Sequence, residues 1–507
     1  MKSIVRFRWA ILVIWLVLAV GLVTQSPNME SLVREKGQIN VPDGYPSSIA
    51  ADIIEEHKPD EEGTSAVIAI FHDEEKLSDS QISAIEKTLM RVEGKKESLK
   101  VKEVTTHFNE EELEDQFVSK DGTTIISLLE VQMSDFEVAE VRKKLKGELK
   151  TNNVDVLMTG SSFINEDVVV SSQEGLKKTE YLTVGFILVV LILVFRSVVA
   201  PLIPLVTVGI SYVVSQSIVA FLVDQLNFPL SNFTQIFMVA VLFGIGTDYC
   251  ILLLSRFKEE LSHGEETIPA IIRTYKTAGK TVFFSGIAVL IGFASIGFAE
   301  FKLYQSAVAV AIGVGVLLIA LVTIVPFFMA TMKKALFWPI KGEMSHPKSK
   351  LWGWAGRLAI GKPLLALVLV AVVTVPFLLM YKGTLSYNSL DEIGDSYESV
   401  RAFNIVSDKF GPGETLPVQI VLENDESMKS QDYLVLIEKI SQNLSAIDQV
   451  DKIRSATRPA GEVIEDLYVT NQVEEVEEGL GEGTKGIREI EKGLSEAADS
   501  IEKSAPE

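Results

Sequence analysis

The residue whose type and position most clearly suggest chemistry is Asp248, which stands inside a long apolar segment of this 507-residue chain. It is essentially the one ionisable carboxyl group within the apolar runs. A charged carboxylate at mid-membrane costs about 2.5–3.5 kcal/mol by insertion scales, so such a residue is normally functional. Because an apolar surrounding favours the neutral form of a carboxyl group, we expect Asp248 to gain and lose a proton near neutral pH. A carrier driven by a proton gradient requires such a group.

Small and hydroxyl-bearing residues stand next to this carboxyl group in the sequence. Tyr249 offers a hydroxyl that can donate to, or relay a proton toward, a carboxylate on a neighbouring helix. Gly244, Gly246 and Thr247 provide a small, close-packing helix face. Two roles therefore fit Asp248. It relays protons together with Tyr249, which we favour, or it stays protonated and holds helices together by hydrogen bonds.

Ser285, in the later apolar segment 281–298, is a supporting candidate. A serine in a membrane helix usually donates a hydrogen bond to the backbone of its own helix. The alternative is that Ser285 helps to hydrate the site around Asp248.

Other kinds of site have little support in the sequence. Gly279-Lys280-Thr281 ends like a phosphate-binding loop, but Thr274 occupies the position of the first glycine of that motif. The single cysteine, Cys250, cannot form an internal disulfide, and the five histidines lack metal-ligand spacing. We therefore expect no catalytic residue, no metal and no cofactor, and we do not expect an enzyme.

Seven segments are long and apolar enough to place these residues in a membrane. About 20 mostly apolar residues span a hydrocarbon core of about 30 Å, because a helix rises about 1.5 Å per residue. The segments run approximately over Trp9–Thr24, Tyr181–Phe195, Pro201–Val223, Ile236–Leu254, Thr281–Phe298, Ala307–Met329 and Pro363–Tyr381. The second to the sixth follow one another with short loops, which predicts a single five-span bundle with Asp248 on the fourth span.

Charge is segregated around these segments. The chain has 47% hydrophobic residues, 23% charged residues and a net charge of −21. Residues 25–180 and residues 382–507 each carry a net charge of −15, and the remaining membrane block is basic. Lys and Arg gather before the first span and after the second, fourth and sixth spans, which predicts that these ends are cytoplasmic and both acidic regions extracellular. Neither acidic region has the basic face that nucleic-acid binding needs, so we expect no nucleic-acid partner.

The chain is therefore predicted to alternate between membrane and extracellular parts. These are the first span (1–24), an extracellular domain (25–180), the five-span bundle (181–332), a basic cytoplasmic linker (333–362), the seventh span (363–381), the start of a second extracellular domain (382–460) and a truncated acidic helix (461–507). An internal repeat supports this order, because residues 45–56 match residues 397–408. Ala19-Val20-Gly21 also resembles the cleavage site of a signal peptide. A cleavable signal would have no reason to recur in mid-chain, which weighs against cleavage.

The first extracellular region has the element order of a small α+β domain. Apolar runs at 66–71, 99–105, 123–131 and 154–159 predict strands, and helical spacing at 78–92 and 135–150 predicts helices. The resulting order, β-α-β-β-α-β, is typical of ferredoxin-like domains. The second region shows only the first half of this pattern, with strands near 417–422 and 449–456 and a helix near 429–445.

The acidic C-terminal segment carries a seven-residue repeat. Leu480, Ile487, Leu494 and Ile501 stand on one stripe, which indicates a coiled coil although Gly483 interrupts it. Two interpretations remain open. The stripe contacts a partner, either another copy of the chain or a complementary polypeptide, or the segment is a long acidic amphipathic helix that packs on nothing specific.

Several of these segments resemble one family. Residues 246–249, Gly-Thr-Asp-Tyr, and residues 255–261 resemble the fourth-span motif of the MMPL family of the resistance-nodulation-division (RND) superfamily. Residues 279–286 are similar to the beginning of that family's fifth span, and residues 336–339 to the segment after its sixth. The long acidic insertion resembles Gram-positive members.

The resemblance implies a multi-pass α-helical membrane protein with extracellular, ferredoxin-like porter domains. It implies export of lipids or other hydrophobic molecules across the plasma membrane, driven by the proton-motive force, with Asp248 and Tyr249 as the proton-relay pair. Family members continue through a second porter domain and five further spans. We therefore expect this chain to be a fragment, or one half completed by another polypeptide.

Two functional hypotheses follow. The first is an exporter half that acts on lipids or hydrophobic molecules and on protons, and Asp248 favours it because a mere anchor gains nothing from a buried carboxyl group. The second is a non-transporting membrane receptor or scaffold whose extracellular domains bind a partner. The acidic helix and the shortness of the chain favour the second.

Overall fold

The computed structural model describes residues 1–37, 41–57, 63–109, 114–133, 137–339, 350–381, 383, 390, 393–414, 417–425, 427–428, 430–448, 450–459, 461–464 and 469–504. They form two units, Met1–Ile420 and Val421–Glu507, which are described separately. Parts of some predicted elements lie outside the described residues, namely 135–136, 340–349, 429, 449, 465–468 and 505–507.

Seven helical segments are long and apolar enough to cross a membrane, and they correspond to the seven predicted spans. The helices are α2 (Arg8–Gln25), α9 (Ser161–Phe195), α10 (Leu202–Leu226), α11 (Thr234–Ser262), α12 (Thr267–Lys276) with α13 (Ala278–Ser295), α15 (Val308–Met332) and α17 (Pro363–Met380). The chain is therefore a multi-pass α-helical membrane protein, as predicted. The second span is the C-terminal part of a 35-residue helix, α9, because no proline interrupts the sequence between Ser161 and Phe195.

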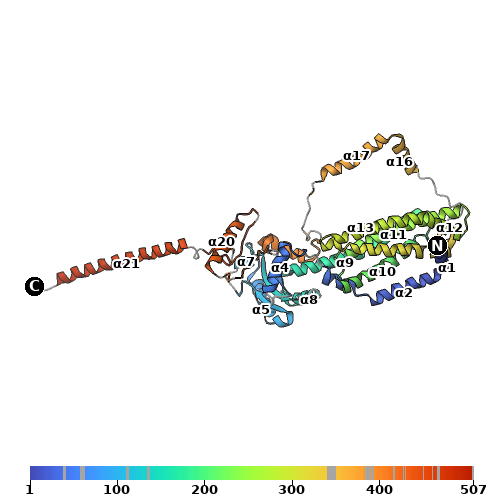
Figure 1. Cartoon of the computed structure of the whole chain (residues 1–507). Helices are drawn as coiled ribbons and strands as arrows, with labels where there is room; N and C mark the ends of the chain where they lie inside the picture. Colours follow the sequence, from blue (N-terminus) through green and yellow to red (C-terminus); the bar gives the residue numbers. More distant parts are fainter. Residues whose placement is uncertain are drawn as a thin grey trace. The chain divides into compact units, whose positions relative to one another are not determined.

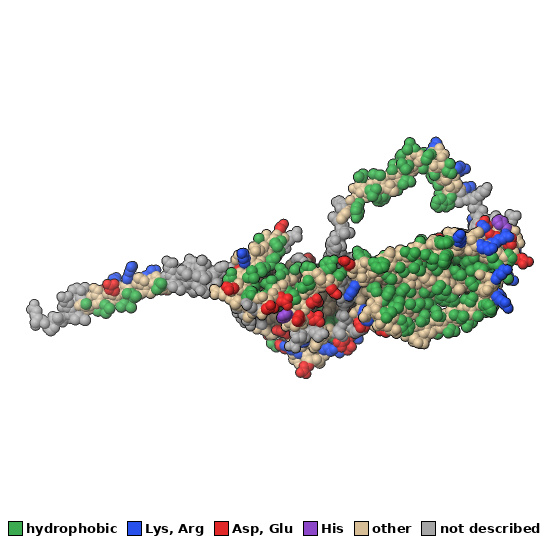
Figure 2. Space-filling model, in the orientation of Figure 1, with side chains coloured by type: hydrophobic (Ala, Val, Ile, Leu, Met, Phe, Trp, Pro, Cys, Tyr) green, Lys and Arg blue, Asp and Glu red, His purple; other side chains and the backbone are tan. Residues whose placement is uncertain are grey.

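Four helices make the core of the bundle. Figure 1 shows α10, α11 and α13 running along the bundle, and α15 contacts all three of them. Buried apolar side chains fill the space between them, among them Val208 of α10, Leu253 of α11 and Leu321 of α15. Figure 2 shows hydrophobic side chains over the visible outer face of the bundle, with Lys and Arg at the end near α12. This distribution suits a lipid-facing surface.

The first span is an integral part of this bundle. Trp15 of α2 is 8% exposed and packs with Val214 of α10 and with Ala320 and Ile324 of α15. Its indole Nε1 donates a hydrogen bond to Thr323 Oγ1 at 3.0 Å. These contacts give α2 a structural role that a cleaved signal peptide would not have.

The segment after the sixth span closes one end of the bundle. Leu336 and Phe337, in the 3-10 helix η4 (Lys333–Phe337), are fully buried. Ser197, between α9 and α10, donates to the carbonyl oxygens of Leu336 (3.0 Å) and Trp338 (2.8 Å). The beginning of the basic linker is therefore held against the loop that follows the second span by hydrogen bonds from a side-chain hydroxyl to its backbone.

The first α+β domain has the predicted element order. Its elements are β1 (Thr64–His72), α5 (Asp79–Glu93), β2 (Val101–Thr105), β3 (Thr124–Gln132), α8 (Val138–Leu149) and β4 (Asp155–Thr159). All neighbouring strands are antiparallel in the order β2-β3-β1-β4. Two β-α-β units with a strand inserted between their parallel strands give this order, which is that of ferredoxin-like domains.

Helices cover both faces of this sheet. On one face α5 and α8 pack against Val67, Ala69 and Phe71 of β1. On the other face, α19 (Glu398–Phe410), which follows the seventh span, packs against Ile68 and Ile70. Because alternate residues of a strand point to opposite faces, both sets must be apolar. This explains the continuous apolar run in β1.

Polar contacts add to this docking of α19. Lys409 Nζ lies 2.5 Å from Asp121 Oδ2, and this contact is the main reason why the pKa of the Asp121 carboxyl lies below its usual range. The Lys146 ammonium pairs with Glu398 at the other end of α19.

The second unit contains two long helices. These are α20 (Gln431–Ser445) and α21 (Val469–Ser504), which confirm the predicted helices. The strands predicted at 417–422 and 449–456 were wrong in the described residues, where no ladder pairs them. A strand needs a hydrogen-bonded neighbour, and Val418 and Ile420 remain 93% and 56% exposed.

The remaining elements are short or connect those above. They are α1 (Lys2–Arg6), α3 (Met29–Lys36), α4 (Pro46–His57), α6 (Lys96–Leu99), α7 (Glu114–Phe117), η3 (Ile296–Phe298), α14 (Lys302–Gln305), α16 (Lys350–Gly361) and η5 (Pro412–Glu414).

Candidate functional site

One face of α11 carries the predicted site residue Asp248 and is open. Phe237, Ala240, Gly244, Asp248 and Leu252 recur every three or four residues, so they lie on one side of the helix. All five are exposed, Phe237 to 39% and Leu252 to 41%. We call this surface the Asp248 stripe. It presents a carboxylate between Gly244 and Leu252 on the exposed side of a membrane-spanning helix.

The opposite side of α11 is wedged between two other spans. A Cβ atom on Gly246 would lie 2.6 Å from Val208 Cγ2 of α10 and 3.1 Å from Leu317 Cδ1 of α15. A contact under 3.0 Å forces the neighbouring side chain to move, so any residue larger than glycine at this position displaces Val208. At Gly244 the same construction meets no atom within 4 Å. The two glycines therefore have different roles. Gly246 permits close packing of α11 against α10 and α15, and Gly244 leaves the surface beside Asp248 free of side-chain atoms.

Tyr249 and Thr247 lie inside the bundle. Each is 8% exposed, and Tyr249 belongs to the apolar core. Consecutive residues of a helix are about 100° apart, so neither side chain shares the face of Asp248. In the described part of the chain the buried Thr247 hydroxyl has no hydrogen-bond partner.

Ser285 bonds to its own helix. Its hydroxyl donates to the carbonyl oxygen of Thr281 at 2.9 Å and lies 3.3 Å from that of Val282. Of the two roles considered for Ser285, this geometry agrees with the hydrogen bond to the backbone of its own helix.

A hollow of about 600 Å³ continues from the Asp248 stripe toward the Arg256 end of α11. Leu252, one helical turn beyond Asp248, lines it together with Ser255, Arg256 and Glu259 and with the start of α13. Arg256 is paired with Glu259 (2.7 Å) and Glu260 (2.6 Å). In the sequence, Arg256 and Glu259 were noted only as part of the motif 255–261. The hollow itself could not be predicted, because it forms only where α11 and α13 pack together.

Two buried carboxylates at the top of α9 were not singled out from the sequence. Asp167 accepts from Arg142 of α8 (2.6 Å) and from the hydroxyl of Ser399 of α19 (2.5 Å). Glu166 pairs with Arg34 of α3 at 3.2 Å. Both carboxylates are less than 8% exposed. The signal was two acids within an otherwise apolar helical run, but their basic partners lie far away in the sequence.

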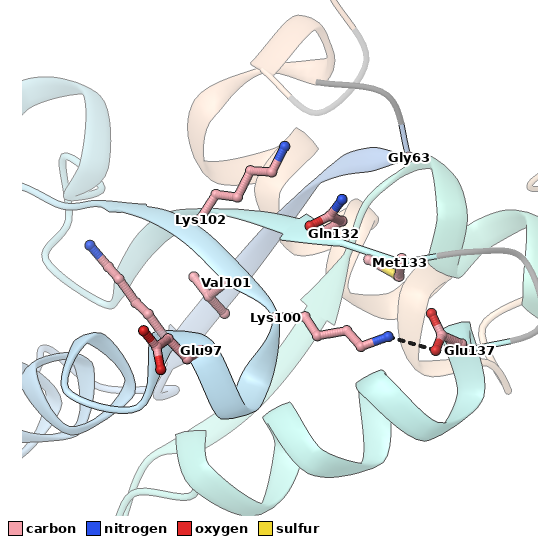
Figure 3. Close-up of a pocket in the computed structure, with 9 residues that line it drawn as sticks. Gly63, Glu97, Lys100, Val101, Lys102, Gln132, Met133 and Glu137 are labelled. Carbon is pink, nitrogen blue, oxygen red and sulfur yellow. Dashed lines mark hydrogen bonds and ion pairs between the residues drawn. The ribbon is translucent and has the colours of Figure 1, made fainter. Parts of the chain in front are cut away.

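A hollow of about 910 Å³ lies beside the edge strand β2 of the α+β domain (Figure 3). Lys100 Nζ, which lines it, is 2.6 Å from Glu137 Oε1, as the dashed line in Figure 3 marks. Lys96 pairs with Glu93 at 3.0 Å. Since these ammonium groups already have carboxylate partners, this hollow is a weaker candidate for a charged ligand than the surfaces on the bundle.

Relatives of this chain are membrane and transport proteins. The membrane protein YdgH of Bacillus subtilis is 41% identical over 488 residues, which are 96% of this chain and 54% of YdgH. MmpL12 of Mycobacterium tuberculosis, named as a probable transport protein, is 24% identical over 94% of this chain and 42% of its own length. MmpL8 of the same species, named as a sulfolipid-1 exporter, is 25% identical over 68% of this chain and 31% of its own length. This chain thus spans about half, or less, of the length of these relatives.

A solved structure also resembles the chain. The crystal structure of SecDF, a translocon-associated membrane protein from Thermus thermophilus, matches with a TM-score of 0.40 and 14% identity, covering 73% of this chain and 64% of that one. A profile of the MMPL family matches residues 40–366, which include the α+β domain, the five-span bundle and Asp248. The chain therefore belongs to the MMPL family of membrane proteins, within the RND superfamily.

Proposed function

We propose that this chain forms half of an exporter of lipids or other hydrophobic molecules across the plasma membrane, driven by the proton-motive force. The observation that carries the proposal is the exposed Asp248 carboxylate on a membrane-spanning helix. A charged carboxylate is unfavourable in contact with lipid, so either another protein segment covers it or the carboxyl group binds a proton. In a proton-coupled carrier the carboxyl group is covered by protein and also binds and releases a proton during each transport cycle.

Asp248 acts in this proposal as the proton-carrying group. Its neighbours Ala240 and Gly244 are small and allow a covering helix to approach the carboxylate closely. A second-half polypeptide or a second copy of the chain supplies that helix. Tyr249 enters from the family resemblance as the relay partner, and its burial means that the hydroxyl reaches Asp248 only through a water molecule or a movement of α11.

The transported molecules are lipids or other hydrophobic compounds. Support comes from the named function of MmpL8 and from the apolar outer surface of the bundle. In the same proposal the N-terminus is cytoplasmic and both acidic domains are extracellular, which places the basic ends of the spans at the cytoplasmic surface.

The test is export from native membrane vesicles with an imposed pH gradient, in which any covering segment is present. Asp248→Asn keeps the size of the side chain but cannot ionise, so we expect proton-coupled export to be lost at matched expression. Tyr249→Phe, which removes only the hydroxyl, should impair export less. Asp224→Asn, at the far end of the neighbouring helix α10, is the matched control and should export normally. If Asp248→Asn exports at the wild-type rate and this export is lost when the pH gradient is dissipated, the coupling site lies elsewhere.

A receptor or scaffold is the second candidate function, and the exposed stripe on α21 favours it. Leu480, Ile487 and Leu494 are each about two-thirds exposed in the described residues. If the chain only binds a partner through its acidic domains, Asp248→Asn should leave every measurable function intact, whereas changes in α21 should abolish partner binding.

A further inference from the structure

We propose that a hollow between α9 and α10 binds the headgroup of a zwitterionic phospholipid, one that carries both a phosphodiester and an ammonium group. The hollow has a volume of about 620 Å³ and lies where α2 ends, α3 begins and α11 begins. We call it the α9–α10 hollow. The inference rests on the proposed export of lipids and names where such a molecule first contacts the chain.

Two opposite charges on α9 are available to this headgroup. Lys177 and Glu180 both line the hollow and are three residues apart, so they are neighbours on the helix surface. In the described part of the chain they form no ion pair with each other or with other residues. The third charged group at the hollow, Glu30, is already paired with Arg34 at 3.0 Å. An ammonium and a carboxylate, one helical turn apart on α9, thus both line the hollow without being paired to each other.

Neutral groups at the hollow complete the recognition of a headgroup. The Gln173 Nε2 amide is buried and has no hydrogen-bond partner among the described residues. A buried donor left unpaired costs about 1–3 kcal/mol, and a phosphate or ester oxygen would satisfy it. The Tyr212 side chain of α10 lines the hollow opposite α9, together with the Glu180 side chain.

The rest of the hollow suits the start of the acyl chains. Leu176 and Ala220 contribute apolar wall beside the charged pair. The adjoining outer surface of α9 is apolar and open, with Leu182 74% and Phe186 72% exposed. A lipid can therefore place its headgroup in the hollow while its tails stay in the bilayer. A soluble phosphoethanolamine ester has the same charges but lacks this second contact.

The direct test is photolabelling of the full chain in nanodiscs of phosphatidylglycerol doped with a photoactivatable phosphatidylethanolamine. We expect labelling of the wild-type chain to fall about tenfold in Lys177→Gln and in Glu180→Gln, since each removes a charge-assisted contact. Lys178→Gln changes the adjacent lysine, which does not line the hollow, and should label like the wild type.

A second probe separates the two charges. With photoactivatable phosphatidylglycerol as the probe, in nanodiscs of unlabelled phosphatidylethanolamine, Lys177→Gln should again reduce labelling. Glu180→Gln should not, because this lipid has no ammonium. Equal losses in Lys177→Gln and Lys178→Gln would indicate nonspecific surface charge and overturn the proposal. So would a Glu180→Gln effect that is the same for both lipids.

Further arms address folding and the source of the ligand. Ala220→Trp fills the hollow without altering a charge and should abolish labelling in a chain that remains monodisperse; full labelling of this variant would overturn the proposal. Excess glycerophosphoethanolamine should compete poorly, and equal competition would make a soluble ester the ligand instead of a lipid.

Because labelling needs no proton gradient, Asp248→Asn should label normally. If the Lys177 and Glu180 variants label like the wild type while export still depends on Asp248, this inference alone is contradicted. If labelling depends on Lys177 and Glu180 while export does not depend on Asp248, the proposed function alone is contradicted.

Discussion

At the scale of single residues, the fourth span separates two tasks that stand next to each other in the sequence. Gly246 and Tyr249 belong to the packed interior, whereas Gly244 and Asp248 lie on the exposed stripe. The sequence identified Asp248 because a carboxyl group in an apolar run is costly whatever its neighbours. It did not indicate which side of the helix is open, because that depends on where α10 and α15 pack.

The two glycines provide a matched test of this division. Gly246→Val should destabilise the bundle by about 1–3 kcal/mol, because a side chain there overlaps Val208 and Leu317. Gly244→Val should leave the stability of this chain unchanged, since its Cβ meets open space. Thermal unfolding of the detergent-solubilised chain measures both. Equal loss of stability in the two variants would mean that the Asp248 stripe is already packed within this chain.

At the scale of elements, the helices and strands that depend on local pattern were predictable. The spans followed from apolar length alone, and the α+β domain followed from strand and helix periodicity. The docking of α19 on the sheet was not predicted, because it joins residues more than 300 positions apart. The strands expected at 417–422 and 449–456 failed for a related reason, since a strand is stable only when a partner strand pairs with it.

The docking of α19 predicts how the α+β domain responds to changes after the seventh span. Val406→Asp puts a charge into the contact with Ile68 and Ile70 and should lower the melting temperature of the domain and speed hydrogen exchange in β1. Arg401→Glu, on the exposed side of the same helix, is the control and should change neither. Unchanged exchange in Val406→Asp would show that α19 does not cover the sheet in the membrane-bound protein.

The acidic helix α21 is rich in residues that disfavour an isolated helix. It contains five glycines, and each costs about 1 kcal/mol relative to alanine in a helix interior. A partner on the exposed stripe of Leu480, Ile487 and Leu494 would offset this cost, so we expect the stripe to mediate association. Ile487→Asn should reduce crosslinking of the full chain to another copy or to a membrane partner, and Glu489→Gln should not. Identical crosslinking of both variants would indicate that the stripe contacts no partner and that the helix is surrounded by solvent.

At the scale of the whole molecule, charge and apolar surface are divided between regions rather than mixed. The two acidic regions have a net charge of −15 each, and the membrane block that separates them in the sequence is basic. A bilayer explains this division, since it favours apolar helices inside and collects Lys and Arg at its cytoplasmic surface. An acidic surface also avoids binding to anionic lipid headgroups. Composition alone therefore indicated the membrane class, whereas the orientation depends on which side each loop occupies.

Thiol labelling of intact cells tests this orientation. Lys120→Cys, in the α+β domain, should react with a membrane-impermeant thiol reagent, and Lys334→Cys, after the sixth span, should react only once the cells are opened. The natural Cys250 is fully buried and should stay silent in both variants, so no cysteine-free background is needed. Reaction of Lys334→Cys but not Lys120→Cys in intact cells would invert the topology. An inverted topology would also reverse the direction in which Asp248 takes up its proton, so export could not use the proton-motive force as proposed.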